Sequence, residues 1–145
     1  MKAVVQRVKK TTLKVDGKLV SEIPKGLAVY FGVGVGDGYD KADYIAKKIF
    51  GLRVFDDEND KMNLSVTDVN GEILVISQFT LLADLSHGNR PGFTNAEKPE
   101  KAKEIYEYFI KRLSEFGVTV KGGVFGADMK IEQCNDGPVT VIYDV

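Results

Sequence analysis

The chain has 145 residues, 43% of them hydrophobic, and its 20 lysines and arginines against 21 aspartates and glutamates leave a net charge of −1. That length is enough for one globular domain with a single core, spanning residues 1–145. Near-neutral charge excludes a general positive field along a nucleic-acid backbone, so any RNA contact is expected to be small and terminal.

The sequence also argues against secretion and membrane insertion. Residues 1–7 lack the apolar stretch of a signal peptide, and no segment approaches the roughly 18 apolar residues that span a bilayer. The single cysteine, Cys134, cannot form a disulfide or a multi-cysteine zinc site within one chain, and we expect it to be a small, partly buried apolar residue. A cytoplasmic protein without membrane contact is therefore predicted.

The first third of the chain predicts an antiparallel start. Apolar and polar residues alternate over residues 4–9, and Asp16-Gly17 is a strong hairpin-turn signal. The run 27–33 is apolar on both faces, as is typical of a central strand.

A tight turn and a helix are expected next. Glycines at 32, 34, 36 and 38 do not match the dinucleotide-binding pattern, because Asp37 and Tyr39 interrupt it, and a turn explains them better. Helical spacing follows over 40–51, with Asp37 or Asp40 available as the N-cap. The apolar positions of this helix are Ala42, Ile45, Ala46, Ile49 and Leu52.

The middle of the chain predicts a solvated loop over the acidic residues 55–61, a turn at 69–72 and a second buried strand over 73–79. A helix over 99–116 follows, with Pro99 in its first turn and Gly117 as its terminator. Thr94 with Glu97 matches a capping box, but a helix beginning there would contain Pro99, so a separate short turn is favoured.

Three strands are expected to close the chain, over 118–120, 129–134 and 139–145. No repeat, linker or low-complexity segment divides the sequence. The fold class expected is α+β: one domain with a mostly antiparallel, barrel-like sheet and two main helices.

Several common site types are absent. There is no phosphate-binding G-x-x-x-x-G-K-[ST] loop and no G-x-S-x-G serine motif, and the only histidine, His87, lies in a loop without an obvious partner. The acidic run 56–60 lacks the ligand spacing of a calcium loop, so neither a metal nor a cofactor is expected.

Two segments remain unusual. Polar residues follow the buried strand in Ser77-Gln78-Phe79-Thr80-Leu81, where a rigid sheet can present hydroxyls and N–H groups to a ligand; the alternative is that Ser77 and Thr80 only satisfy neighbouring backbone. The segment Asp136-Gly137-Pro138-Val139-Thr140 precedes the last strand, and its alternative interpretation is an ordinary trans Gly-Pro turn.

Taken together, Ser77-Gln78-Phe79-Thr80-Leu81 and Gly137-Pro138-Val139-Thr140 resemble the two signature motifs of the D-aminoacyl-tRNA deacylase family. Three further segments are similar to that family in the same order, so the resemblance covers essentially the whole chain: 3–8, 90–93 and 123–129. The loop His87-Gly88-Asn89-Arg90 is less basic than is common in the family, which weakens its expected part in gripping tRNA phosphates.

The resemblance implies a homodimer in which the Gly137-Pro138 segment of one subunit, with a cis peptide bond, completes the active site of the other. Its carbonyl oxygens would hold the substrate's α-ammonium, so that a side chain of the L hand would strike the motif. D-Amino acids of many kinds would be accepted because their side chains point outward, and glycine would also be hydrolysed. The implied reaction releases a D-amino acid from the 3′-terminal adenosine of tRNA.

The resemblance also assigns roles to single residues. Arg7 would anchor the Gly-Pro segment, and its alternative role is a surface arginine. Phe125 and Met129 would pack against the terminal adenine, and their alternative role is core packing. Val139 and Thr140 would bind substrate as part of the Gly-Pro motif.

For catalysis, the resemblance points to Ser77, Gln78, Phe79 and Thr80. Backbone N–H groups near Phe79 and Thr80 would stabilise the negative charge that develops on the ester carbonyl oxygen. Thr80 is a possible nucleophile, but no histidine or lysine is committed to activating it. We therefore favour a substrate-assisted route in which the 2′-hydroxyl of the terminal ribose helps to activate water.

Overall fold

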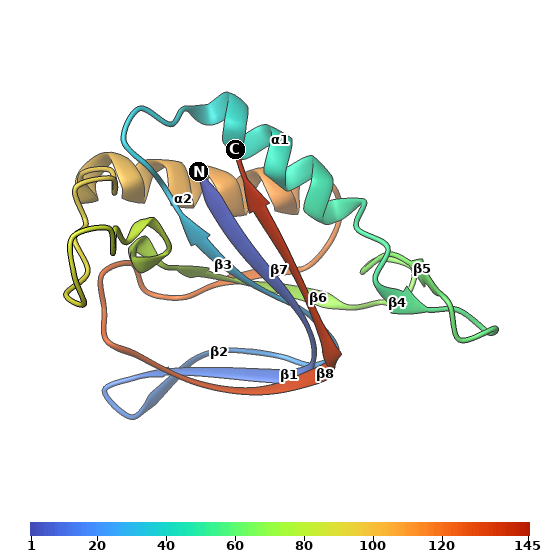
Figure 1. Ribbon diagram of the computed structural model, residues 1–145. Helices are drawn as coiled ribbons and strands as arrows, with labels where there is room; N and C mark the ends of the chain where they lie inside the picture. Colours follow the sequence, from blue (N-terminus) through green and yellow to red (C-terminus); the bar gives the residue numbers. More distant parts are fainter.

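The computed structural model describes residues 1–145, and its elements are arranged around one long strand, β1 (Figure 1). In chain order the elements are β1 (Lys2–Val15), β2 (Lys18–Ile23), β3 (Gly26–Gly32), α1 (Tyr39–Phe50), β4 (Phe55–Asp56), β5 (Met62–Leu64), β6 (Glu72–Ser77), the 3-10 turn η1 (Phe79–Leu82), α2 (Pro99–Ser114), β7 (Val120–Gly122) and β8 (Met129–Asp144).

The main sheet has six strands, in the order β2-β1-β3-β6-β7, with β8 on the remaining edge of β1. β1 pairs antiparallel with β2, β3 and β8, whereas β6 is parallel to both β3 and β7. Ser21 Oγ donates to Gly122 O over 2.6 Å and Lys121 Nζ donates to Glu22 O over 2.7 Å, which ties β2 to β7. The sheet is therefore nearly closed and barrel-like, as expected, with a parallel portion that the sequence did not reveal.

The first hairpin and the central strand are as predicted from the sequence. Asp16 and Gly17 have φ of 50° and 75°, the left-handed conformation that a tight hairpin turn requires, and they join β1 to β2. β3 is buried along nearly its whole length because it lies between β1 and β6.

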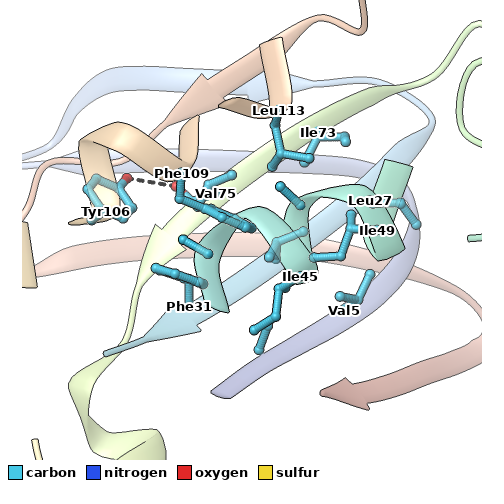
Figure 2. Close-up of a cluster of buried hydrophobic side chains, with 14 of the residues drawn as sticks. Val5, Leu27, Phe31, Ile45, Ile49, Ile73, Val75, Tyr106, Phe109 and Leu113 are labelled. Atoms are coloured by element: carbon cyan, nitrogen blue, oxygen red, sulfur yellow. Dashed lines mark hydrogen bonds between the residues drawn. The ribbon is translucent and has the colours of Figure 1, made fainter. Parts of the chain in front are cut away.

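Both helices lie on one face of the sheet, and the main core fills the space between the helices and the sheet (Figures 1 and 2). Phe31 of β3 stacks on Phe109 of α2 with ring centroids 4.1 Å apart, and Ile45 and Ile49 of α1 are fully buried beside them. The predicted helices at 40–51 and 99–116 are confirmed to within two residues. Helical periodicity was therefore a sufficient signal for this layer.

A second, smaller core fills the barrel on the opposite face of the sheet. It consists of six buried residues contributed by β1, β2, β3 and β6: Val8, Leu13, Ile23, Ala28, Leu74 and Ile76. β3 and β6 are therefore buried on both faces, which explains why their sequences are continuously apolar.

Neither Asp37 nor Asp40 caps α1. The N-cap is Gly38, and no side chain bonds to the first turn. Asp37 is instead buried, with its carboxylate 2.6 Å from the α-ammonium of Met1, 2.7 Å from Lys41 Nζ and 2.7 Å from the N–H of Gly34. A buried carboxylate needs partners of this kind. Because Asp37 bonds to these groups, it does not cap the first turn of α1.

The second buried strand is shorter than the predicted 73–79, because β6 ends at Ser77 and residues 79–82 form η1. The chain turns tightly here against the end of β3. A Cβ on Gly32 would lie 2.8 Å from Gln78 O and 2.6 Å from Leu82 Cδ2, so glycine is required for this close approach.

The acidic segment 55–61 is not wholly a solvated loop. Phe55 is fully buried, and β4 pairs with β5 in a small two-stranded hairpin whose tip carries the acidic residues. An aromatic residue adjoining a polar run was the available signal that one end of this segment belongs to the core.

The end of the chain differs from prediction in three ways. β7 covers 120–122 rather than 118–120, and the two strands predicted at 129–134 and 139–145 are one strand, β8. β8 stays paired with β1 because a register shift between Gln6 and Val8 accommodates residues 136–139, which include the Gly-Pro segment. Cys134 is exposed on β8, contrary to the expectation of partial burial. No helix is long and apolar enough to cross a membrane.

Candidate functional site

A cavity of about 630 Å³ opens where β3 and β6 end, between η1, the start of α2 and the segment that leads into β8. Twelve of its 19 lining residues are hydrophobic. Of the residues predicted from the sequence to form the site, five line the cavity: Ser77, Gln78, Phe79, Phe125 and Met129. A mainly apolar cavity with a few polar groups at strand ends is the usual form of a small-ligand site.

One wall is the turn that follows β6. The N–H of Gln78 donates to Phe31 O over 2.8 Å and is the last bond from this segment to β3. η1 begins at Phe79, and the first N–H groups of a helical turn have no acceptor within that turn. This wall therefore brings donors and the Ser77 hydroxyl to the cavity on a rigid sheet.

Thr80 lies just beyond the cavity lining. Its side chain is exposed, and its hydroxyl accepts a hydrogen bond from Gln78 Nε2, the only side-chain bond that it makes. No histidine, lysine or carboxylate bonds to Thr80. The structure thus supplies no general base to this hydroxyl.

The opposite wall is formed by Phe125 and Met129. Both are half-buried: Phe125 packs against the main core and Met129 against the barrel core, while each also faces the cavity. Core packing and a role in the cavity are therefore compatible for these two residues. They offer an aromatic ring and a thioether, surfaces on which a nucleobase can rest.

The mouth of the cavity carries an exposed aromatic pair: Phe79 was predicted to belong to the site, but its pairing with Phe93 was not predicted. The rings of Phe79 and Phe93 meet edge to face with centroids 4.9 Å apart, and Phe79 is 58% exposed. Phe93 comes from the loop before α2, whose residues 92 and 84 form an isolated bridge. An apolar pair at this position extends the apolar lining out to the surface.

Most charges of the cavity wall are paired. Glu97 accepts from the N–H groups of Lys98 and Gly36 and from Lys101 Nζ, and these bonds hold the pKa of Glu97 below its usual value. Asp128 is paired with Lys130. Lys98 Nζ makes no ion pair, so it is the one cation of the lining free to meet an anion.

Tyr106 is a buried residue of the cavity wall, and the sequence patterns did not identify it as part of the site. Tyr106 is only 3% exposed, and its hydroxyl bonds to Val75 O and to the N–H of Gly123. Tyr106 is four residues after the buried Ala102 and three before the buried Phe109, and this spacing was the available signal that its position faces inward.

The Gly-Pro segment lies elsewhere in the chain. The Gly137-Pro138 peptide bond is cis, and the segment sits opposite Arg7, whose Nε donates to Asp136 O over 3.1 Å. The Arg7 guanidinium is buried, and it also bonds to Val54 O and Asp56. Arg7 is therefore not a surface arginine but joins the Gly-Pro segment to the start of β4.

Within one chain the two motifs are apart. Arg7 pairs with Leu27 near the start of β3, whereas Ser77 pairs with Phe31 near its end, a separation of about 13 Å along the strand. The predicted site residues outside the cavity are Thr80, Arg7, Gly137, Pro138, Val139 and Thr140. Val139 packs against the main core, and Thr140 accepts a bond from Gln6.

Comparison with known proteins identifies the family of this chain. Residues 4–144 match the family model described as D-Tyr-tRNA(Tyr) deacylase. The chain belongs to this family. Proteins named D-aminoacyl-tRNA deacylase from Persephonella marina and Clostridioides difficile are 56% and 51% identical to it over 144 residues, covering 99% of this chain and 97% of each relative.

Solved structures agree with this deacylase-family fold. One described as c-Myc DNA Unwinding Element Binding Protein has a TM-score of 0.93 at 39% identity, covering 100% of this chain and 99% of the other. Another, described as a probable eukaryotic D-amino acid tRNA deacylase, has a TM-score of 0.82 at 16% identity and covers 99% and 98%. Family membership confirms the resemblance drawn from the five sequence segments.

Proposed function

We propose that this protein hydrolyses the ester between a D-amino acid and the 3′-terminal adenosine of tRNA. The observation that carries the proposal is the 630 Å³ cavity, which has the Ser77–Phe79 wall on one side and Phe125 with Met129 on the other, in a chain of the D-Tyr-tRNA(Tyr) deacylase family. The curated relatives named D-aminoacyl-tRNA deacylase support the same activity.

The terminal adenosine is proposed to enter the cavity with its base against Phe125 and Met129. An adenine ring gains from stacking on aromatic and thioether surfaces, and the wall behind them is rigid because it packs against both cores. Only the end of the tRNA would enter, which agrees with a protein whose net charge is −1.

The ester is proposed to lie against the turn after β6. Attack by water places negative charge on the former carbonyl oxygen, and the N–H groups at the start of η1 are suited to stabilise it. The 2′-hydroxyl of the ribose helps to activate the water, since Thr80 has no base beside it. Ser77 and Gln78 then position the ester rather than attack it.

Chirality is proposed to be read by the Gly137-Pro138 segment of a second copy of the chain. The separation of this segment from the cavity within one chain supports a contribution from a partner subunit. Its carbonyl oxygens hold the substrate's α-ammonium, so that an L side chain meets main chain and is rejected. Val139 and Thr140 continue this substrate-facing segment, and glycyl-tRNA mischarged on tRNA-Ala is hydrolysed because glycine has no side chain to exclude.

The test is hydrolysis of matched D- and L-tyrosyl-tRNA, with glycine mischarged on tRNA-Ala as a third substrate. Rapid release of D-tyrosine and glycine, with L-tyrosyl-tRNA left intact, is expected. Equal release of D- and L-tyrosine would contradict the chirality mechanism, and release of neither would contradict the activity.

A second candidate function is binding of nucleic-acid ends without catalysis. The solved structure described as c-Myc DNA Unwinding Element Binding Protein, at 39% identity, is the observation in its favour. Under this alternative the chain binds deacylated tRNA ends yet releases no amino acid from any aminoacyl-tRNA. The same hydrolysis assay, run beside a tRNA-binding titration, separates the two.

A further inference from the structure

The hydroxyl of Tyr106 is a buried polar group. The apolar pattern of α2 predicts only an apolar side chain at this position. Its neighbours on the inner face of α2 are Ala102, Ile105, Phe109 and Leu113, all buried. A hydroxyl without partners costs free energy when it is buried, so its bonds have to compensate. Phenylalanine would fill the same space without this requirement.

The Tyr106 hydroxyl is bonded on both sides. It donates to Val75 O over 2.9 Å, the bond drawn in Figure 2, and accepts the N–H of Gly123 over 3.0 Å. The Gly123 N–H also lies 3.0 Å from Val75 O. The hydroxyl therefore sits where β6 and β7 stop pairing, since Val75 and Gly122 are their last register partners.

This junction carries both walls of the cavity. Val75 is two residues before Ser77, and Gly123 is two residues before Phe125. The Tyr106 ring itself lines the cavity, with its centroid 5.8 Å from that of Phe125. The hydroxyl thus reinforces the direct Gly123 N–H to Val75 O bond, at the point just before each segment reaches the cavity.

The Tyr106 hydroxyl also lies close to β7, at Gly122. A Cβ on Gly122 would lie 3.2 Å from the Tyr106 hydroxyl oxygen and 2.8 Å from Ile110 Cδ1. Burial also raises the pKa of Tyr106 to about 12, so the hydroxyl keeps its proton and donates throughout the neutral range.

We propose that Tyr106 is a positioning residue that sets the separation of the two cavity walls and thereby the affinity for the aminoacylated adenosine. The inference rests on the proposed function of this cavity. Tyr106 contacts no reacting atom, so its loss loosens the substrate without removing a catalytic group. Binding therefore changes more than turnover.

The test compares Tyr106→Phe with the wild type in two measurements. One is KM and kcat for D-tyrosyl-tRNA. The other is the calorimetric Kd of a non-hydrolysable amide of D-tyrosine with the 3′ position of adenosine. We expect KM and Kd to rise about tenfold with kcat within about twofold, since Val75 O and the Gly123 N–H lose a partner in the cavity wall.

Two matched variants separate positioning from general stability. Tyr108→Phe makes the same change two residues later, where the hydroxyl bonds to Asp43 instead, and it is expected to leave KM and Kd unchanged. Ile105→Val weakens the same helix face without touching the hydroxyl. Unchanged Kd in Tyr106→Phe, or an equal rise in Ile105→Val at the same loss in Tm, would overturn the inference.

The outcomes also separate this inference from the proposed function. Wild-type protein that binds the amide but hydrolyses no D-tyrosyl-tRNA contradicts the proposed activity, while the Kd comparison still decides the role of Tyr106. Wild-type protein that neither binds the amide nor hydrolyses D-tyrosyl-tRNA overturns both, and wild-type protein that hydrolyses D-tyrosyl-tRNA without binding the amide leaves the KM comparison to decide the role of Tyr106. Normal hydrolysis with no effect of Tyr106→Phe overturns the inference alone.

Discussion

Arg7 and Asp37 are charged residues that the fold buries, Arg7 bonded to Asp136 and Asp37 paired with the N-terminus. Each holds together segments that lie far apart in the chain. Thr80, by contrast, is exposed, and its hydroxyl makes a single side-chain hydrogen bond, to Gln78.

Replacement of Thr80 tests the catalytic route at this scale. Because its hydroxyl has no base, Thr80→Ala is expected to lower kcat for D-aminoacyl-tRNA by less than about tenfold. Thr80→Ser, which keeps a hydroxyl, is the matched control. A loss of a thousandfold or more in Thr80→Ala, restored by Thr80→Ser, would instead identify the threonine as the nucleophile.

At the scale of elements, the helices and the first hairpin were predictable and the strand boundaries were not. Helical periodicity and turn residues are local signals, so the helix predicted over 99–116, which the structure ends at Ser114, and the Asp16-Gly17 turn were visible in the sequence. The end of β6 at Ser77 depends on the close contact of Gly32 with Gln78, and the continuity of β8 depends on β1 as its partner. Such contacts between distant segments decide where a strand stops.

The loop before α1 is held by Asp37, and this contact gives a pH-dependent prediction. Burial raises the pKa of Asp37, but hydrogen bonds from Lys41, the α-ammonium of Met1 and the Gly34 N–H outweigh it, so that the pKa lies below its ordinary 3.8. A lowered folded-state pKa means that the carboxylate stabilises the fold above the ordinary pKa, and that this contribution is lost as the pH falls through the folded-state value.

Asp37→Asn is therefore expected to lower the free energy of unfolding by roughly 3 kcal/mol at pH 7, because two cations lose their partner. The difference from wild type should shrink as the pH falls below 3.8 and through the lowered folded-state pKa, because the wild-type carboxyl then becomes protonated too. Urea denaturation at pH 7 and over a series of acid pH values measures it. Asp40→Asn, at an exposed position in the first turn of α1, is the control, and a constant difference across pH would contradict the assignment.

At the scale of the whole molecule, the cavity and the Gly-Pro segment are the features that the fold keeps apart. The family resemblance identified both motifs, but only the register of β1, β3 and β6 reveals their separation within the chain. The cavity itself was not predictable, since its walls come from the end of β6, the start of α2 and the segment before β8. Sequence motifs named part of the site, and its shape required the three-dimensional packing.

Mixed dimers test whether the site is shared. Pro138→Ala alters the segment proposed to serve the partner, and Ala127→Trp fills the cavity of its own chain. Each is expected to be inactive alone, whereas refolding an equal mixture should restore about a quarter of wild-type activity, because half of the dimers contain one intact site of two. No recovery in verified heterodimers would contradict a shared site.

The pairing of β8 with β1 also bears on how the chain is made. Residues 129–144 complete the sheet by bonding along almost the full length of residues 2–15. β1 therefore cannot complete its pairing until β8 has been synthesised. Pairings between segments this remote in the sequence are slow to form. Until β8 has paired with β1, one edge of β1 stays uncovered. The β1–β8 pairing, and with it the nearly closed sheet, therefore forms only after residues 129–144 have left the ribosome.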